Sequence, residues 1–157
     1  MIRIGHAWDT HRLVEHRKLI LGGIEVESEL GLLGHSDADV VLHAVAESLL
    51  GSLALGDLGT YFPDTSEKTL NMDSKIILKN CYGMIKDRGY HLLNLDLTIY
   101  AQNIKIAPIR DNIRKFIADI LEISVDYVSV KATTYEKMGF IGRGEAIACE
   151  CVCLVES

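Results

Sequence analysis

The chain is poor in aromatic residues and in proline, and it has no excess of basic side chains. Aromatics make up 6% of the 157 residues, and there are only two prolines. Lys and Arg number 16 against 22 Asp and Glu, which gives a formal charge of -6. Because nonspecific binding to nucleic acid needs a dense basic surface, this balance argues against a nucleic-acid partner. No apolar run approaches the roughly 18 residues of a membrane helix, and no charged start precedes an apolar core, so we expect a cytoplasmic protein without a membrane partner.

The four cysteines lack the paired C-x-x-C spacing of a zinc knuckle. Three of them, Cys149, Cys151 and Cys153, alternate with other residues near the end of the chain. Since alternate residues of a strand share one face, these thiols are predicted to pack on one face of a buried strand as small hydrophobes. Glu150 lies within this apolar strand, and its carboxylate needs a partner, a subunit interface or water.

The length, with 48% hydrophobic and 24% charged residues, suits a single globular domain over 1–157. Apolar periodicity and turn signals indicate a mixture of strands and helices along the chain, which predicts an α+β fold. Long apolar strands that are buried on both faces favour an oligomer for so small a domain. We expect strands at 1–11, 92–101, 126–133 and 145–155, a hairpin at 17–26 turning at Gly22-Gly23, and helices at 38–54, 73–88 and 108–121.

Two motifs carry most of the chemical information: the D-T-H triplet from Asp9 to His11, and the run GHSDADVVLH, which ends at His43. Ile2 and Ile4 alternate in a segment that reads as a strand. In a strand, residues i and i+2 share a face about 7 Å apart, so the Asp and His of the triplet can converge on one ion. With His43 from a separate element, they form an oxygen and nitrogen set suited to zinc. Three protein ligands leave one coordination position open, which is typical of catalytic zinc.

The helix expected over 38–54 positions His43. Ser36 and Asp39 form an S-x-x-D capping signature at its start. Asp39 precedes His43 by four residues on the same face, and we hypothesise that it accepts the free ring N–H and fixes the tautomer. Taken singly, the aspartate-histidine pair could be exposed at a strand end, the helical histidine could be satisfied in the core, and the serine could be only a cap. Together these residues predict a metal site.

Three further loops concentrate polar residues. The loop 55–66 follows the helix that carries His43 and contains several breakers, so it is a candidate substrate flap. In 101–109, Lys105 lies between a strand end and a helix start, where backbone N–H groups favour an anion. The glycines of 131–145 form neither a Walker loop nor a dinucleotide fingerprint; simple turn glycines are the alternative to a functional loop.

The motifs D-x-H, GHSDADVVLHA, LGDLGTYFPDT, KATTYEKMGFIGRGE and IACE cover nearly the whole chain. In order and spacing, this set resembles the 2-C-methyl-D-erythritol 2,4-cyclodiphosphate synthase family of the non-mevalonate isoprenoid pathway. The resemblance implies a homotrimer with active sites at subunit interfaces, each subunit having a mixed sheet with helices packed on one face. It also implies a small phosphorylated substrate, 4-diphosphocytidyl-2-C-methyl-D-erythritol 2-phosphate, and as products the cyclic diphosphate and CMP.

Roles carry over onto the matching positions. The resemblance implies Zn²⁺ held by Asp9, His11 and His43, and a second divalent ion, Mg²⁺ or Mn²⁺, held by Glu136 with the substrate diphosphate. His35 and Thr134 match residues that stabilise the transition state. The implied substrate contacts are Asp9, His11, His35, Ser36, Asp57, Gly59, the flap residues Phe62, Pro63, Asp64, Thr65 and Ser66, the cytidine and phosphate pocket of Ala101, Lys105, Ile106 and Ala107, and Thr133, Thr134, Glu136, Phe140 and Arg143.

The implied reaction suits these residue types, because its nucleophile is a phosphate oxygen of the substrate and no serine or cysteine nucleophile is needed. The protein must hold the reacting groups in line, which can be worth about 7–11 kcal/mol, and neutralise the phosphates. Trp8, Ile104 and Tyr135 depart from the residues frequent in the family and bear on nucleotide affinity. Two other functions remain open: a zinc-dependent phosphohydrolase, and a non-catalytic binder of cytidine nucleotides or isoprenoid diphosphates.

Overall fold

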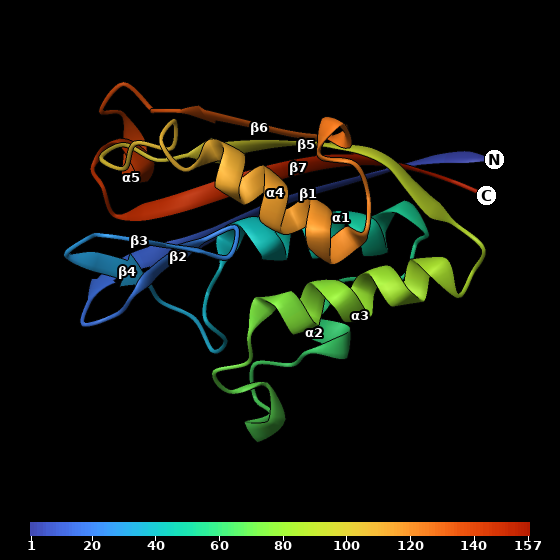
Figure 1. Cartoon of the computed structure of the whole chain (residues 1–157). Coiled ribbons are helices and arrows are strands. Elements are labelled where there is room, and N and C mark those ends of the chain that lie inside the picture. The colour runs from blue at the N-terminus through green and yellow to red at the C-terminus, as the bar shows by residue number, and fades with distance from the viewer.

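The computed structural model describes residues 1–157 as a five-stranded sheet with a layer of helices against one face (Figure 1). The strands are β1 (Ile2–Glu15), β2 (Leu19–Leu21), β3 (Ile24–Val26), β4 (Leu30–Leu32), β5 (His91–Tyr100), β6 (Val128–Thr133) and β7 (Ala146–Glu156). The helices are α1 (Val40–Ser52), α2 (Leu58–Tyr61), α3 (Ser74–Lys86), α4 (Arg110–Leu121) and α5 (Gly139–Gly142), with short 3₁₀ turns at Glu67–Thr69 and Val125–Tyr127.

The sheet has the order β4-β1-β7-β5-β6, and β2 and β3 form a separate hairpin. Only β5 and β6 run parallel; the other neighbouring pairs are antiparallel. β1 and β7 pair along almost their whole length, from Ile2↔Glu156 to Arg12↔Ala146. The α+β prediction of a mixed sheet with helices on one face is therefore confirmed.

Helix α1 is the centre of the core, because the sheet covers one side of it and α3 the other. Ten of its thirteen residues are buried. On the strand beneath, Gly5 lets the helix come very close: a Cβ built there would lie 1.8 Å from the Ser48 carbonyl oxygen of α1. This close approach brings the helix side of β1 against the side chains at the start of α1.

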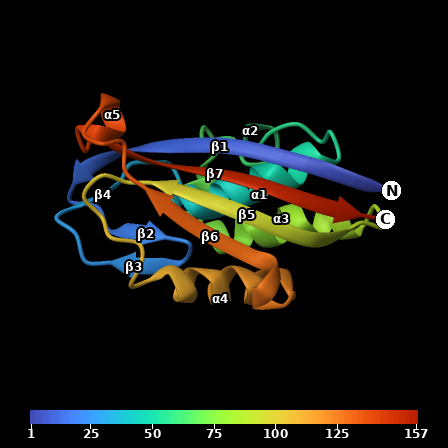
Figure 2. The ribbon, with the colours of Figure 1, turned by 90° about the horizontal axis from the view of Figure 1, so that it is seen from above.

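The opposite face of the sheet has no helix over it (Figure 2). Along β1 the residues alternate, so that Gly5 and Ala7 are buried while Ile2, Ile4 and Trp8 are 59%, 64% and 40% exposed. On β7 the thiols of Cys149, Cys151 and Cys153 all point into the core, as predicted. The prediction that both faces of this strand are buried is wrong within one chain, since Val152 on the outer face is 37% exposed.

The long elements agree with the sequence expectations to within a few residues, and the hairpin turns at Gly22-Gly23 with positive φ at both glycines. Three short elements, β4, α2 and α5, have no periodic apolar signal and were not predicted. The start of α1 corrects the capping prediction. Asp39, not Ser36, is the N-cap, and its Oδ1 accepts from the N–H groups of Val41 and Leu42 at 3.1 Å.

None of the helices is both long and apolar enough to span a membrane.

Candidate metal centre and substrate cleft

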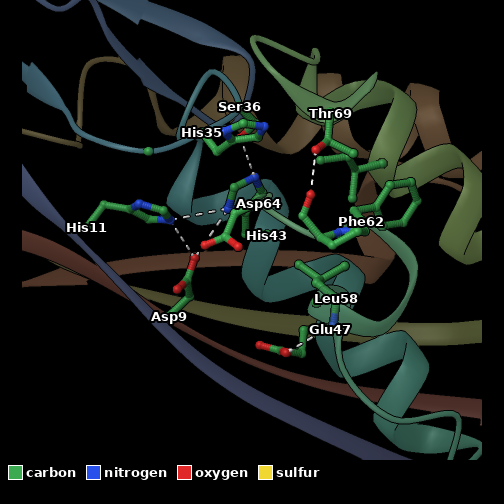
Figure 3. A pocket seen from close by; sticks show the side chains of 14 residues that line it. Asp9, His11, His35, Ser36, His43, Glu47, Leu58, Phe62, Asp64 and Thr69 are labelled. Carbon is green, nitrogen blue, oxygen red and sulfur yellow. Dashed lines mark hydrogen bonds and ion pairs between the residues drawn. The ribbon is translucent and has the colours of Figure 1, made fainter. Parts of the chain in front are cut away.

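The three predicted metal ligands meet between the sheet and α1. Asp9 and His11 lie on the helix side of β1, two residues apart, and His43 lies one turn into α1. Their side chains point toward one another (Figure 3). His11 Nε2 lies 3.0 Å from Asp9 Oδ2 and 3.2 Å from His43 Nδ1, and the His43 Nδ1 to Asp9 Oδ2 distance is 3.4 Å.

This triangle of donor atoms fits a tetrahedral metal ion. Zinc binds nitrogen and oxygen at about 2.0–2.2 Å, so two ligand atoms of a tetrahedral site are separated by about 3.3–3.6 Å. The observed edges of 3.0–3.4 Å are close to that spacing. The trio is also the only group of three or more such side chains whose donor atoms could share one ion. Two nitrogens and a carboxylate oxygen are ligands that suit zinc.

The backbone sets the orientation of the His11 ring. His11 Nδ1 lies 2.8 Å from the Leu33 carbonyl oxygen, which can only accept, so Nδ1 carries the proton and donates. Nε2, which faces Asp9 and His43, then keeps its lone pair for a metal. Gly34 makes room for this ring, because a Cβ there would lie 3.2 Å from His11 Nδ1 and 2.8 Å from the Ala38 side chain.

The hypothesis that Asp39 accepts the free ring N–H of His43 is wrong. Both Asp39 oxygens are directed elsewhere: besides capping α1, they accept from the N–H groups of Gly22 at 2.9 Å and Gly23 at 2.7 Å. The carboxylate thus joins the β2–β3 turn to the start of α1. His43 Nε2 instead faces two hydroxyls, Ser74 Oγ at 2.8 Å and Ser36 Oγ at 3.1 Å.

Electrostatics favour a charged pair at this point. Burial disfavours the ionised form of Asp9, but the interactions of its carboxylate with His11 and His43 outweigh burial and hold the pKa of Asp9 well below its ordinary value. Burial alone would lower the pKa of His11, but the hydrogen bond and charge of Asp9 raise it overall. The metal-free site therefore attracts a positive charge, which a divalent ion would supply.

A cleft of about 410 Å³ opens in front of the trio, a size that suits a small-molecule ligand. Of the predicted substrate contacts, it is lined by Asp9, His11, His35, Ser36, Gly59, Phe62, Pro63 and Asp64. Sequence reasoning missed five lining residues: Gly34, Glu47, Leu58, Thr69 and Ile77. For Glu47 a signal existed, because it follows His43 by four residues on the same helical face. Its carboxylate accepts from the Leu58 N–H at 3.4 Å and so ties α1 to α2 (Figure 3).

Other predicted contacts lie beside the cleft without lining it. Asp57 caps α2 through Thr60, whose N–H and hydroxyl donate to it at 3.0 and 2.8 Å. The Ser66 carbonyl oxygen lies 2.8 Å from His35 Nε2, which joins the predicted flap to the loop before α1. Thr65 lies in the same flap segment and does not line the cleft.

A second group of predicted site residues gathers at the ends of β5 and β6. The Ala101 N–H donates to the Thr133 carbonyl oxygen at 3.1 Å, and the Lys137 N–H donates to Gln102 Oε1 at 3.1 Å. Tyr135 packs edge-on against Tyr100. The members of this group do not line the metal cleft of the same chain: Ala101, Lys105, Ile106, Ala107, Thr133, Thr134, Glu136, Phe140 and Arg143.

Fold and cleft together define an α+β protein in which an Asp-His-His group that could hold a metal ion lines an open cleft. The sequence matches the YgbB family over residues 2–156. It is 52% identical to the 2-C-methyl-D-erythritol 2,4-cyclodiphosphate synthase of Leptospira borgpetersenii over 157 residues, covering 99% of this chain and 98% of that one. The chain belongs to the YgbB family, which confirms the resemblance seen in the motifs.

Solved structures agree with this assignment. The bifunctional IspDF of Campylobacter jejuni superposes with a TM-score of 0.95 at 36% identity, over 99% of this chain. The chain spans 42% of the length of that protein. The CDP complex of Plasmodium falciparum IspF gives a TM-score of 0.86 at 37% identity, over 98% of this chain and 95% of that one.

Proposed function

We propose that the chain is a metal-dependent lyase that converts 4-diphosphocytidyl-2-C-methyl-D-erythritol 2-phosphate to 2-C-methyl-D-erythritol 2,4-cyclodiphosphate and CMP. It acts in non-mevalonate isoprenoid biosynthesis as a single cytoplasmic domain over 1–157. The carrying observation is the open triangle of Asp9, His11 and His43, which lines a polar cleft. Relatives that carry this synthase name align over 99% of this chain and 98–99% of their own length.

The side chains around the cleft suit an intramolecular transfer better than covalent catalysis. In this reaction a phosphate oxygen of the substrate attacks the β-phosphorus and CMP leaves. None of the four cysteines is available as a nucleophile, since all are buried. The protein has to fold the substrate so that the two phosphates lie in line, and it has to exclude water. Orienting the reacting groups in this way can lower the barrier by about 7–11 kcal/mol. His35 and Thr134 are proposed to contact the charge that develops in the transition state.

Zn²⁺ is proposed at the Asp9, His11 and His43 trio, and Mg²⁺ or Mn²⁺ at Glu136 with the substrate diphosphate. Bound divalent ions would neutralise and polarise phosphoryl oxygens. This explains how a protein with a formal charge of -6 accepts a highly anionic substrate.

A homotrimer with active sites at its subunit interfaces is part of the proposal. The two groups of site residues do not share a cleft within one chain, and a neighbouring copy could bring them together. The uncovered face of the sheet supports assembly, because Ile2, Ile4, Trp8 and Val152 form an exposed apolar surface there. Glu150 lies on this face with both oxygens engaged, by His6 Nε2 at 2.8 Å and by the Tyr100 hydroxyl at 2.7 Å.

Phosphorus NMR of the purified protein with zinc, magnesium and the diphosphocytidyl substrate tests the reaction. We expect CMP and the cyclic diphosphate in equal amounts. Release of inorganic phosphate would instead identify a hydrolase, and bound zinc without turnover would identify a binding protein.

Subunit complementation tests the interface. His43→Ala and Glu136→Ala proteins, each inactive alone, are unfolded, mixed in equal amounts and refolded together. If each site takes its metal trio from one subunit and Glu136 from the next, about a quarter of the sites regain both groups. Activity that stays at the level of the separately refolded variants would contradict a shared site.

A further inference from the structure

The ring nitrogen of His43 that faces away from the metal site lies against a chain of polar groups from two other segments. His43 Nε2 is 2.8 Å from the hydroxyl of Ser74, the first residue of α3. That hydroxyl donates a hydrogen bond to Asp37 Oδ1, in the loop before α1. The other Asp37 oxygen accepts from the Ser74 N–H at 3.1 Å. Ser74 is completely buried, so water does not compete for these bonds.

The direction of the bonds in this chain follows from what each group can do. A carboxylate can only accept, so the single proton of the Ser74 hydroxyl points at Asp37. The hydroxyl then presents a lone pair to His43 Nε2 at 2.8 Å, so Nε2 is the protonated nitrogen of the ring, and the Ser36 hydroxyl at 3.1 Å is a second acceptor for it. His43 Nδ1 is left with its lone pair directed at the position enclosed by Asp9 and His11. In His11 a backbone carbonyl has the same effect on the opposite nitrogen.

We propose that Ser74 and Asp37 are positioning residues for the metal centre: they hold His43 as the Nε2–H tautomer and fix its ring for coordination through Nδ1. The inference deepens the proposed function and rests on its assignment of a metal to the Asp9, His11 and His43 trio. Neither residue lines the cleft, so their effect passes through His43. Hydrogen-bond partners of metal-bound histidines typically contribute about 10–100-fold to metal affinity.

The arrangement also joins the segment that follows the predicted flap to the metal site. The Asp37 N–H donates to the Met72 carbonyl oxygen at 3.2 Å, and the Asn71 N–H donates to the His35 carbonyl oxygen at 2.8 Å. The ring of His43 thus lies where residues 71–72, the start of α3 and the loop before α1 are held together. A displacement of residues 71–72 would reach the metal ligand through Ser74.

Competition between the full-length protein and a fluorescent chelator for Zn²⁺ alone measures the effect without any turnover. Ser74→Ala is expected to weaken zinc binding about 10–100-fold. Asp37→Asn keeps the size of the side chain and is expected to weaken it in the same direction, because an amide cannot accept from both Ser74 groups. Ser52→Ala is the matched control: Ser52 is a buried serine on α1 whose hydroxyl bonds only the Leu49 carbonyl oxygen, and loss of this hydroxyl should leave zinc affinity within about two-fold.

Long-range proton-nitrogen NMR of histidine-labelled, zinc-loaded protein reads the tautomer directly. In the wild type we expect His43 Nε2 to be protonated and Nδ1 to be metal-bound, and in Ser74→Ala a weakened Nε2–H hydrogen bond that shifts the Nε2 resonance. Zinc affinities of Ser74→Ala and Asp37→Asn equal to the wild type, with an unchanged Nε2 resonance, would overturn the proposal. Circular dichroism identifies any variant that fails to fold, and the other variant then decides. If His43→Ala also binds zinc normally, the metal assignment itself fails; if only the two positioning variants do, the present inference fails alone.

Discussion

Gly5 connects the packing of the core to the geometry of the metal site. In Gly5→Ala the new Cβ would lie 1.8 Å from the Ser48 carbonyl oxygen and 2.9 Å from Cys153 Sγ. Real Cβ contacts do not fall below 3.0 Å, so α1 must move away from β1 by about 1.2 Å. The obstacle is helix backbone, which cannot rotate away as a side chain could. Overpacking of this kind costs about 1–3 kcal/mol, which for a domain of this size lowers Tm by about 3–10 °C.

The same displacement separates the metal ligands, because His43 belongs to α1 while Asp9 and His11 belong to β1. A shift of that size exceeds the tolerance of about 0.5 Å within which a functional site must be held, so zinc affinity should fall at least about tenfold. Thermal unfolding with excess chelator isolates the packing cost, and zinc competition measures the site. Gly83→Ala is the control: a Cβ there meets nothing within 4 Å, and alanine in this helix should stabilise by about 0.5–1 kcal/mol. Unchanged Tm and zinc affinity in Gly5→Ala would refute the link between helix approach and site.

Three further outcomes are expected. His43→Ala should lose both bound zinc and turnover. His91 is an exposed residue at the start of β5, so His91→Ala should keep both. Metal analysis and the CMP assay check this, and a His43→Ala protein that is active without zinc would contradict the ligand set. In metal-free protein the raised pKa of His11 adds stability that is complete below its ordinary value of 6.5 and is lost as pH rises through the raised value. Zinc binds the neutral ring of His11. As pH rises from 6 to 8, the Tm of the protein in chelator should therefore fall, and the increase in Tm caused by zinc should become larger. Parallel curves of Tm against pH with zinc and with chelator would contradict this. Burial raises the pKa of every thiol, that of Cys81 to about 12, so an aromatic disulfide reagent at pH 8 should modify no cysteine until the protein unfolds.

The sequence predicted the long elements well because their apolar residues recur with the period of the structure that they form. The strand that carries Asp9 and His11 and the helix that carries His43 are both of this kind, so the metal trio could be assembled from spacing alone. Elements of three or four residues, such as β4, α2 and α5, have too few positions to show a period. Their place is determined by caps and tertiary contacts, for example the bonds from Asp57 to Thr60 at the start of α2.

Residues that reach the site from distant segments were the harder part of the prediction. Ser74 lies 31 positions after His43, and no local spacing connects the two. Thr69 and Ile77 line the cleft for the same reason, since the chain returns to it after the flap. In the second group, Lys105 and the loop 131–145 were candidates from the sequence itself, but the individual roles of these residues came only through the family resemblance. Their distance from the metal cleft within one chain is a property of the fold that sequence spacing does not encode.

The two aspartates of the D-A-D motif illustrate where spacing stops being informative. Asp39 is four residues before His43, the separation at which helical side chains meet, and this favoured it as the partner of the ring. That spacing applies only within a helix, and Asp39 is the N-cap, with extended backbone. Its carboxylate therefore turns back over the first turn and meets the N–H groups of Gly22 and Gly23 instead. Asp37, two residues earlier and outside the helix, is free to bond the start of α3, and it reaches His43 through Ser74. One aspartate thus fixes the helix that carries the ligand, and the other orients the ligand's ring.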